Sequence, residues 1–139
     1  MLNQGIQLLP GAANIKSVYQ RVLKCTTADF ICLSTGYEAV IGEWYDQEFE
    51  LKLFGSDIKT REVVADTAGN RNYGAKKDGV KNQARYLQDA AESDLIVTDS
   101  FVAIVSFAPE SPYAVVIEDL SIVKSAKVWF EAIWASAAR

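Results

Sequence analysis

Apolar runs as long as a β-strand alternate with helix-period apolar patterns along most of this chain. Strands are expected at residues 6–9, 29–34 and 58–65, with helices over residues 15–23 and 38–54 between them. Continuous apolar strands separated by amphipathic helices are typical of a sheet that is covered on both faces. The sequence therefore predicts an α/β fold with helices on both sides of one sheet.

The C-terminal third predicts further strands at residues 95–98, 101–107 and 113–118, followed by a closing helix over residues 122–134. Strands joined by short turns pair antiparallel, so the sheet is expected to be mixed. The chain contains no internal repeat, low-complexity run or linker. Its 139 residues therefore predict a single domain over residues 1–139.

Side chains that can cap a helix precede the first and the last of these helices. Asn14 is expected to cap the first helix, and Asp119 or Ser121 the last.

The polar stretch at residues 66–82 is the longest irregular segment, with room for a helical turn or two over residues 72–77 and a short strand after it at residues 84–88. A basic cluster lies in and beside this stretch, made up of Arg71, Lys76, Lys77, Lys81 and Arg85. Asp78 interrupts the cluster, and the net charge of the chain is −4. These features favour a solvated connection over a nucleic-acid contact.

The sequence contains no histidine, which excludes Ser-His-Asp and Cys-His nucleophile systems and His-ligated metal sites. Neither GxGxxG nor GxxxxGK[ST] occurs, and Cys25 and Cys32 match no metal motif. We therefore predict no catalytic residue, no metal and no cofactor. No apolar run approaches the ~20 residues of a membrane span and no signal peptide is evident. We expect a cytoplasmic protein with both cysteines reduced and no membrane partner.

Polar side chains follow two of the expected strands, where ligands collect in open α/β sheets. The candidate ligand-binding residues are Ser34, Thr35, Asp66, Thr67, Asn70 and Arg71. A plain turn is the alternative for each of them. The acidic side chains of Glu43, Asp46 and Glu50 share one side of the second helix and are interpreted as a solvated face.

Trp44, Trp129 and Trp134 lie on apolar helical stripes, which favours core or subunit packing over stacking on bases or sugars. Trp129 and Trp134 are the residues expected at a dimer interface.

The C-terminal third resembles the end of a phospholipase-D-like half: Ser106 ends one strand, an acidic pair closes residues 113–119, and Phe130-x-x-x-Trp134 closes the helix. More narrowly, the chain resembles the effector domain of TrmB-like transcriptional regulators. The matching segments are Gly11 with Ile15, Val18 and Tyr19, residues 61–67 with Asn70, Arg71 and Tyr73, and residues 85–87 ahead of residues 102–106.

The resemblance implies a phospholipase-D-like fold and a domain that senses a small-molecule effector, a sugar in the best-known members, as a homodimer. Catalytic phospholipases D need an H-x-K-x(4)-D signature, which a chain without histidine cannot supply. Such regulators also carry a winged helix-turn-helix, which these residues do not resemble. The chain is therefore either part of a longer regulator or a free-standing domain, with no nucleic-acid contact of its own.

Two alternatives remain at the level of sequence. The chain could be a dimerisation or protein-docking module without a ligand. It could also be a degenerate phosphodiesterase with another nucleophile, such as Ser106, although a serine without a base is a weak nucleophile.

Overall fold

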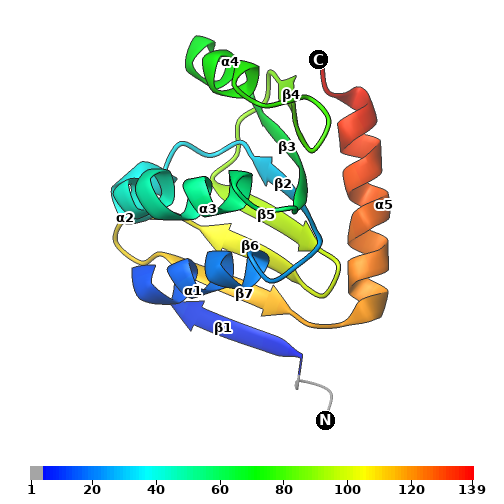
Figure 1. Ribbon diagram of the computed structural model, residues 1–139. Coiled ribbons are helices and arrows are strands. Elements are labelled where there is room, and N and C mark those ends of the chain that lie inside the picture. Colours follow the sequence, from blue (N-terminus) through cyan, green and yellow to red (C-terminus); the bar gives the residue numbers. More distant parts are fainter. Residues whose placement is uncertain (1–4) are drawn as a thin grey trace.

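The computed structural model describes residues 5–139, which form one mixed sheet of seven strands in the order β1-β7-β6-β5-β2-β3-β4 (Figure 1). The strands are β1 (Ile6–Pro10), β2 (Thr27–Cys32), β3 (Lys59–Ala65), β4 (Asn82–Leu87), β5 (Ser93–Thr98), β6 (Val102–Ser106) and β7 (Tyr113–Ile117). β2, β3 and β4 run parallel, whereas β2–β5, β5–β6, β6–β7 and β1–β7 pair antiparallel. The mixed α/β sheet predicted from the sequence is confirmed.

Helices cover both faces of the sheet, as expected (Figure 1). They are α1 (Ala12–Val22), α2 (Tyr37–Trp44), the π-helical segment η1 (Tyr45–Phe49), α3 (Glu50–Phe54), α4 (Ala68–Ala75) and α5 (Leu120–Ser136). Residues of α1, α2, η1 and α3 pack with Phe30 of β2 in the main core. On the opposite face, Phe130 of α5 packs on Val63 of β3, and Val123 packs with Val97.

Alternation along the strands assigns neighbouring side chains to the two faces. In β3, Glu62 points toward the face covered by α1–α3, and Val63 points toward α5. In β2, Phe30 lies in the main core, whereas Asp29 pairs with Arg61 under α5. Both faces of the central strands are therefore buried, which explains their continuous apolar runs.

Three local predictions need correction. Asn14 lies inside α1 and donates its side-chain N–H to Pro10 O at 2.6 Å, while Gly11, with φ of 88°, is the N-cap. The helix expected over residues 38–54 is interrupted by η1, because i→i+5 hydrogen bonding widens one turn. The polar stretch, in which a helical turn or two is expected over residues 72–77, contains α4, which begins earlier, at Ala68. The cap at Asp119 is confirmed, since its carboxylate accepts the Ser121 and Ile122 N–H groups.

Within residues 5–139, none of the helices combines the length and the apolar composition that a bilayer span requires.

Candidate functional site

A cavity of about 310 Å³ opens at the carboxyl ends of β2 and β3, beside the start of β5. Its floor is made by strand residues and its walls by α1, α2, η1, α3 and α4. The lining residues are Tyr19, Cys32, Ser34, Tyr37, Glu38, Tyr45, Asp46, Glu50, Glu62, Val64, Gly69, Asn70, Tyr73 and Asp94. Five of these are carboxylates and four are tyrosines, and no Lys or Arg of the described residues is among them. The volume is at the lower end of the range for small-molecule sites.

Asp94 forms part of the cavity floor and is only 3 % exposed. Its Oδ1 accepts the Ser34 Oγ–H at 2.8 Å and the Ser34 N–H at 3.4 Å. Burial raises the pKa of the Asp94 carboxyl to about 6, although the Ser34 donors act in the opposite direction. No Lys or Arg pairs with Asp94 in the part of the chain that the structure describes.

Glu62 is the second buried carboxylate of the floor, with 2 % of its surface exposed. The Lys77 ammonium lies 2.5 Å from Glu62 Oε2, and the Lys77 side chain is itself only 3 % exposed. At this separation the ammonium is a direct, charge-assisted partner of the carboxylate, so Glu62 and Lys77 form a buried ion pair. Lys77 also lies over the rings of Phe54 and Tyr73, 4.2 and 4.5 Å from their centroids. Lys77 therefore balances the charge of Glu62.

Tyrosine rings form one wall of the cavity. The ring centroid of Tyr45 lies 5.2 Å from that of Tyr37 and 5.6 Å from that of Tyr19. Burial raises the pKa of Tyr19 and Tyr45 well above the ordinary value and that of Tyr37 to about 12. Tyr73, on the α4 side, likewise has a raised pKa, first because of burial and then because of Glu62. These phenols are therefore neutral hydrogen-bonding and stacking groups.

The π-helical segment contributes Tyr45 and Asp46 to the cavity, and α3 contributes Glu50 at its first position. Glu38 and Asp46 are exposed at the rim, whereas Glu50 is partly buried. Burial raises the pKa of the Glu50 carboxyl. The solvated-face interpretation is therefore wrong for Glu50. π-Helical turns occur frequently at functional sites.

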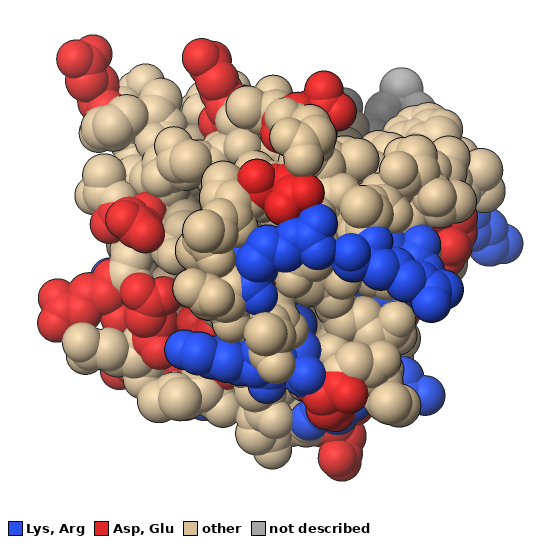
Figure 2. Space-filling view, turned by 90° about the horizontal axis from the view of Figure 1, so that it is seen from above, with Lys and Arg blue, Asp and Glu red and all other residues tan. Residues whose placement is uncertain are grey.

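Acidic side chains also gather on one side of the molecular surface (Figure 2). Figure 2, a view from above Figure 1, shows acidic side chains gathered toward the side on which α2 lies, and a band of Lys and Arg side chains across the middle. An acidic surface beside the cavity raises the local concentration of cations.

The six predicted ligand-binding residues separate into two groups. Ser34 and Asn70 line the cavity, and Asn70 donates its side-chain N–H to Ala65 O at 2.8 Å. Thr67 caps α4 by accepting the Asn70 N–H, and Thr35 is exposed. Asp66 and Arg71 lie outside the cavity lining and form a two-point ion pair with each other, at 2.8 and 2.9 Å.

The sequence prediction did not include Glu62 and Asp94. Each is an acidic residue inside an otherwise apolar strand, at E-V-V-A and D-L-I-V respectively. A charged residue at a core-facing position of a buried strand is rare and is the signal that could have identified them.

The solvated connection predicted for the basic cluster holds for Lys76, which is exposed, but not for the other four side chains. Lys77 is buried, and Lys81 Nζ donates to Phe54 O and Ser56 O at 3.0 and 2.5 Å at the end of α3. Arg85 donates to Trp134 O at 2.7 Å, and Arg71 lies over the Tyr86 ring at 3.9 Å. These side chains hold elements of this chain together.

The two tryptophans predicted at a dimer interface differ. Trp134 is 7 % exposed, stacks on Phe130 at 5.9 Å and covers Arg85. Its position corrects the prediction for this residue, because the ring is used inside the chain. Trp129 is 59 % exposed on α5.

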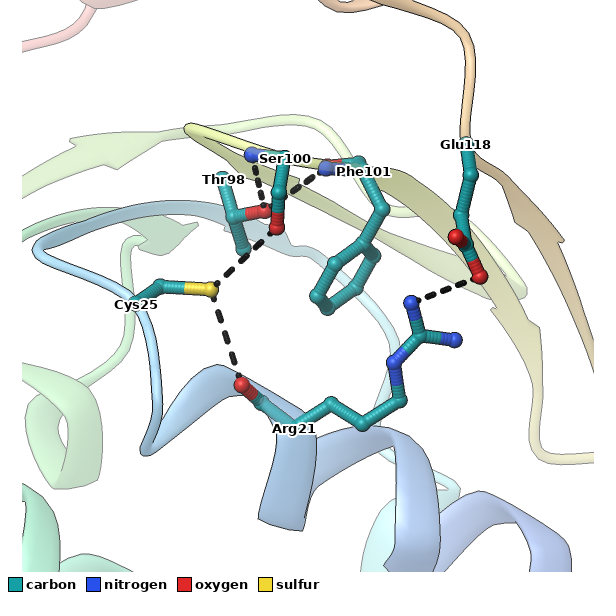
Figure 3. A network of polar contacts seen from close by, with 6 residues as sticks. All are labelled: Arg21, Cys25, Thr98, Ser100, Phe101 and Glu118. Atoms are coloured by element: carbon teal, nitrogen blue, oxygen red, sulfur yellow. Dashed lines mark hydrogen bonds and ion pairs between the residues drawn. The ribbon is translucent and has the colours of Figure 1, made fainter. Parts of the chain in front are cut away.

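A second polar network lies at the other end of β5, where the strand turns into β6 (Figure 3). The Cys25 thiol contacts Arg21 O at 3.5 Å and Ser100 Oγ at 3.7 Å, and Arg21 pairs with Glu118 at 2.9 Å. Thr98 Oγ1 accepts the N–H groups of Ser100 and Phe101 and closes the turn. Burial raises the pKa of the Cys25 thiol, which disfavours its thiolate form. This network connects α1 to the sheet.

Comparison with known proteins places the fold. No protein-family model matches the chain, and no curated protein does. Among solved structures, the archaeal chromatin protein TrmBL2 matches 99 % of this chain with a TM-score of 0.67 at 18 % identity. This chain spans about half of TrmBL2, 55 % of its length.

Two further solved structures match this chain over nearly the whole length of both proteins. NucT from Helicobacter pylori has a TM-score of 0.71 at 8 % identity, covering 96 % of this chain and 98 % of NucT. Nuc, a phospholipase D family member from Salmonella typhimurium, has a TM-score of 0.66 at 12 % identity, covering 95 % of each chain. The resemblance seen in the sequence is confirmed at the level of fold: the chain has a phospholipase-D-like fold, which it shares with part of TrmBL2.

Proposed function

We infer that this chain is a non-catalytic domain that binds a small molecule and works in a transcriptional regulator. The observation that carries this inference is the 310 Å³ cavity with two buried carboxylates on its floor, one of which, Asp94, has no cationic partner among residues 5–139. Buried ionisable groups with perturbed pKa values in a cavity are candidates for function. A sugar is one ligand to be tested, because carboxylates and aromatic rings can bond and cover its hydroxylated ring.

The regulatory part of the inference rests on TrmBL2, whose structure is described as that of a chromatin protein with a novel mode of DNA binding. Because this chain corresponds to only part of TrmBL2, DNA contact in such a regulator is assigned to another segment or another protein. The basic side chains at residues 71–85 support this assignment, since four of them are engaged within the chain. A cytoplasmic location belongs to the same proposal.

The non-catalytic part rests on the sequence, which contains no histidine to attack phosphorus. Ser106, the alternative nucleophile, lies at the end of β6 and is not among the residues that line the cavity. Hydrolysis of a generic phosphodiester that disappears in Ser106→Ala would overturn this part.

Native mass spectrometry of the freshly purified chain tests ligand binding and subunit number together. We expect a homodimer with a reproducible additional mass, which denaturation releases. Melting-temperature shifts across sugars, nucleotides and amines then identify the class, because a ligand that binds only the folded state must raise the melting temperature. A bare chain that no compound stabilises would contradict the proposal.

Docking without a ligand is the second candidate, favoured by the exposed apolar side chains of α5. Leu120, Val128 and Trp129 are 66, 68 and 59 % exposed. In that case Trp129→Ala gives a folded monomer, and the cavity variants leave partner binding unchanged.

A further inference from the structure

The charge balance of the cavity indicates the chemical class of its ligand. Five carboxylates line the cavity. In the described part of the chain, one of them, Glu62, forms an ion pair with a cation, which is Lys77. Ionised carboxylates that lose water without a partner are strongly destabilising. In the free protein, solvent in the open cavity can hydrate these carboxylates. A ligand that displaces this solvent must itself supply hydrogen bonds or positive charge.

Two buried carboxylates lie on the floor of the cavity, and they differ in their partners. Glu62, 2 % exposed, forms an ion pair with the buried Lys77. Asp94 accepts two hydrogen bonds from Ser34, both on Oδ1, and has no cationic partner in the described residues. They lie on β3 and β5, on either side of β2, and both point toward the α1–α3 face. A group that donates hydrogen bonds and carries positive charge supplies the partner that Asp94 lacks.

The wall opposite this floor is suited to the same kind of group. The rings of Tyr19, Tyr37 and Tyr45 line the cavity together, with Tyr45 packed edge-to-face with Tyr19 and tilted against Tyr37. Aromatic faces attract ammonium groups, and the attraction is greatest where water is displaced. The exposed Glu38 and Asp46 at the rim extend the negative potential to the entrance.

We propose that the cavity binds a small organic cation whose ammonium group pairs with Asp94 and lies against the tyrosine wall. This inference rests on the proposed function and narrows it. A neutral sugar leaves Asp94 without a counter-charge, and an anionic ligand such as a phosphate ester adds repulsion. The volume of about 310 Å³ accommodates an organic molecule. No three His, Cys, Asp or Glu side chains of residues 5–139 are grouped closely enough to hold a metal ion.

The decisive experiment compares glucosamine with glucose, two molecules of the same shape of which only the first carries an ammonium group. Calorimetric titration at pH 7.5 is run with this pair, with 1,4-diaminobutane, choline and glucose 6-phosphate, and with Ca²⁺ and Mg²⁺ alone. We expect at least one amine to bind, more than tenfold tighter than glucose, and more weakly as salt is added.

Variants locate the binding. Asp94→Asn keeps the acceptor for Ser34 and is expected to weaken amine binding at least tenfold. Glu50→Gln, on the partly buried wall, provides a second variant in case Asp94→Asn perturbs folding, and is expected to weaken binding several-fold. Glu48→Gln is the matched control, because Glu48 is exposed on the same π-helical segment and does not line the cavity. We expect its affinity to stay within twofold of that of the natural chain.

The outcomes separate this inference from the function it depends on. Equal affinities for glucose and glucosamine would overturn the inference of a cationic ligand but not that of small-molecule binding. Release of a neutral or anionic compound from the purified chain would have the same meaning. Binding of Ca²⁺ or Mg²⁺ without any amine also overturns it. If none of the amines binds and native mass spectrometry shows a bare chain, both proposals are contradicted.

Discussion

Buried charges occur on both faces of the sheet, and the two sets differ in how they are satisfied. Under α5, Arg61 donates two hydrogen bonds to Asp29, at 3.0 and 2.9 Å, and contacts Glu131 at 2.7 Å. The rings of Phe130 and Trp134 cover its guanidinium at 4.9 and 5.5 Å. On the other face, Glu62 pairs with the buried Lys77, whereas Asp94 accepts hydrogen bonds from Ser34 and has no cationic partner among residues 5–139.

The difference separates charges used for structure from charges available for function. Asp29 and Arg61 are directly opposite each other on β2 and β3, so the sheet itself aligns them. Two-point guanidinium–carboxylate pairing is the strongest common ion-pair geometry. The cavity carboxylates keep a destabilising arrangement, which natural proteins retain mainly at functional sites.

The largest effect is expected for Trp134→Ala, which removes the ring that covers both Arg61 and Arg85. Loss of a buried aromatic ring of this size costs about 3–5 kcal/mol of unfolding free energy. Urea denaturation measures it, with Trp129→Ala, exposed on the same helix, as the control expected to change stability by less than about 0.5 kcal/mol. Equal effects of the two variants would show that Trp134 is not part of the core.

Arg61→Met should destabilise the chain by about 2–4 kcal/mol, because it leaves Asp29 buried without its counter-charge. The exposed Lys59→Met on the same strand is the control. Denaturation midpoints that coincide for both variants would mean that the Asp29–Arg61 pair contributes little.

Asp94→Asn should change the free energy of unfolding in the opposite direction and stabilise the free protein at pH 7 by about 1–3 kcal/mol. The folded-state pKa of Asp94 is raised to about 6 from an ordinary value of 3.8. The ionised carboxyl therefore costs stability above pH 6, and the cost disappears as the pH falls from about 6 to 4. Stability measured across this range should rise relative to the variant as the pH falls. A variant less stable than the natural chain at pH 7 would contradict the contrast between the two faces.

Ser34→Ala is expected to have the smallest effect, about 1–2 kcal/mol of destabilisation at pH 7, because one hydrogen bond to an ionised group is lost. The same change should raise the pKa of Asp94 above 6, which NMR titration of its carboxyl carbon can follow. Thr35→Ala, next in sequence and exposed, is the control. An unchanged pKa in Ser34→Ala would show that burial alone sets the titration of Asp94.

Local sequence patterns predicted most of the fold. The apolar runs gave β2, β3, β5, β6 and β7 near their observed bounds, and the stripe at residues 15–23 gave α1. Periodicity is a local property, so it is readable without knowledge of partners. The π-helical segment was not predicted, because one widened turn barely changes the pattern of apolar residues over residues 38–54.

The sequence by itself determined the alternation of elements, the two-faced sheet and the absence of histidine chemistry. Only the tertiary structure decided which charges meet. Ser34 and Asp94 are 60 residues apart, and Arg61 and Asp29 are 32 apart. Lys77 and Glu62 meet because α4 crosses from β3 to β4. Whether a charge is buried, paired or left open to a ligand depends on neighbours brought together by strand order, which no local pattern encodes.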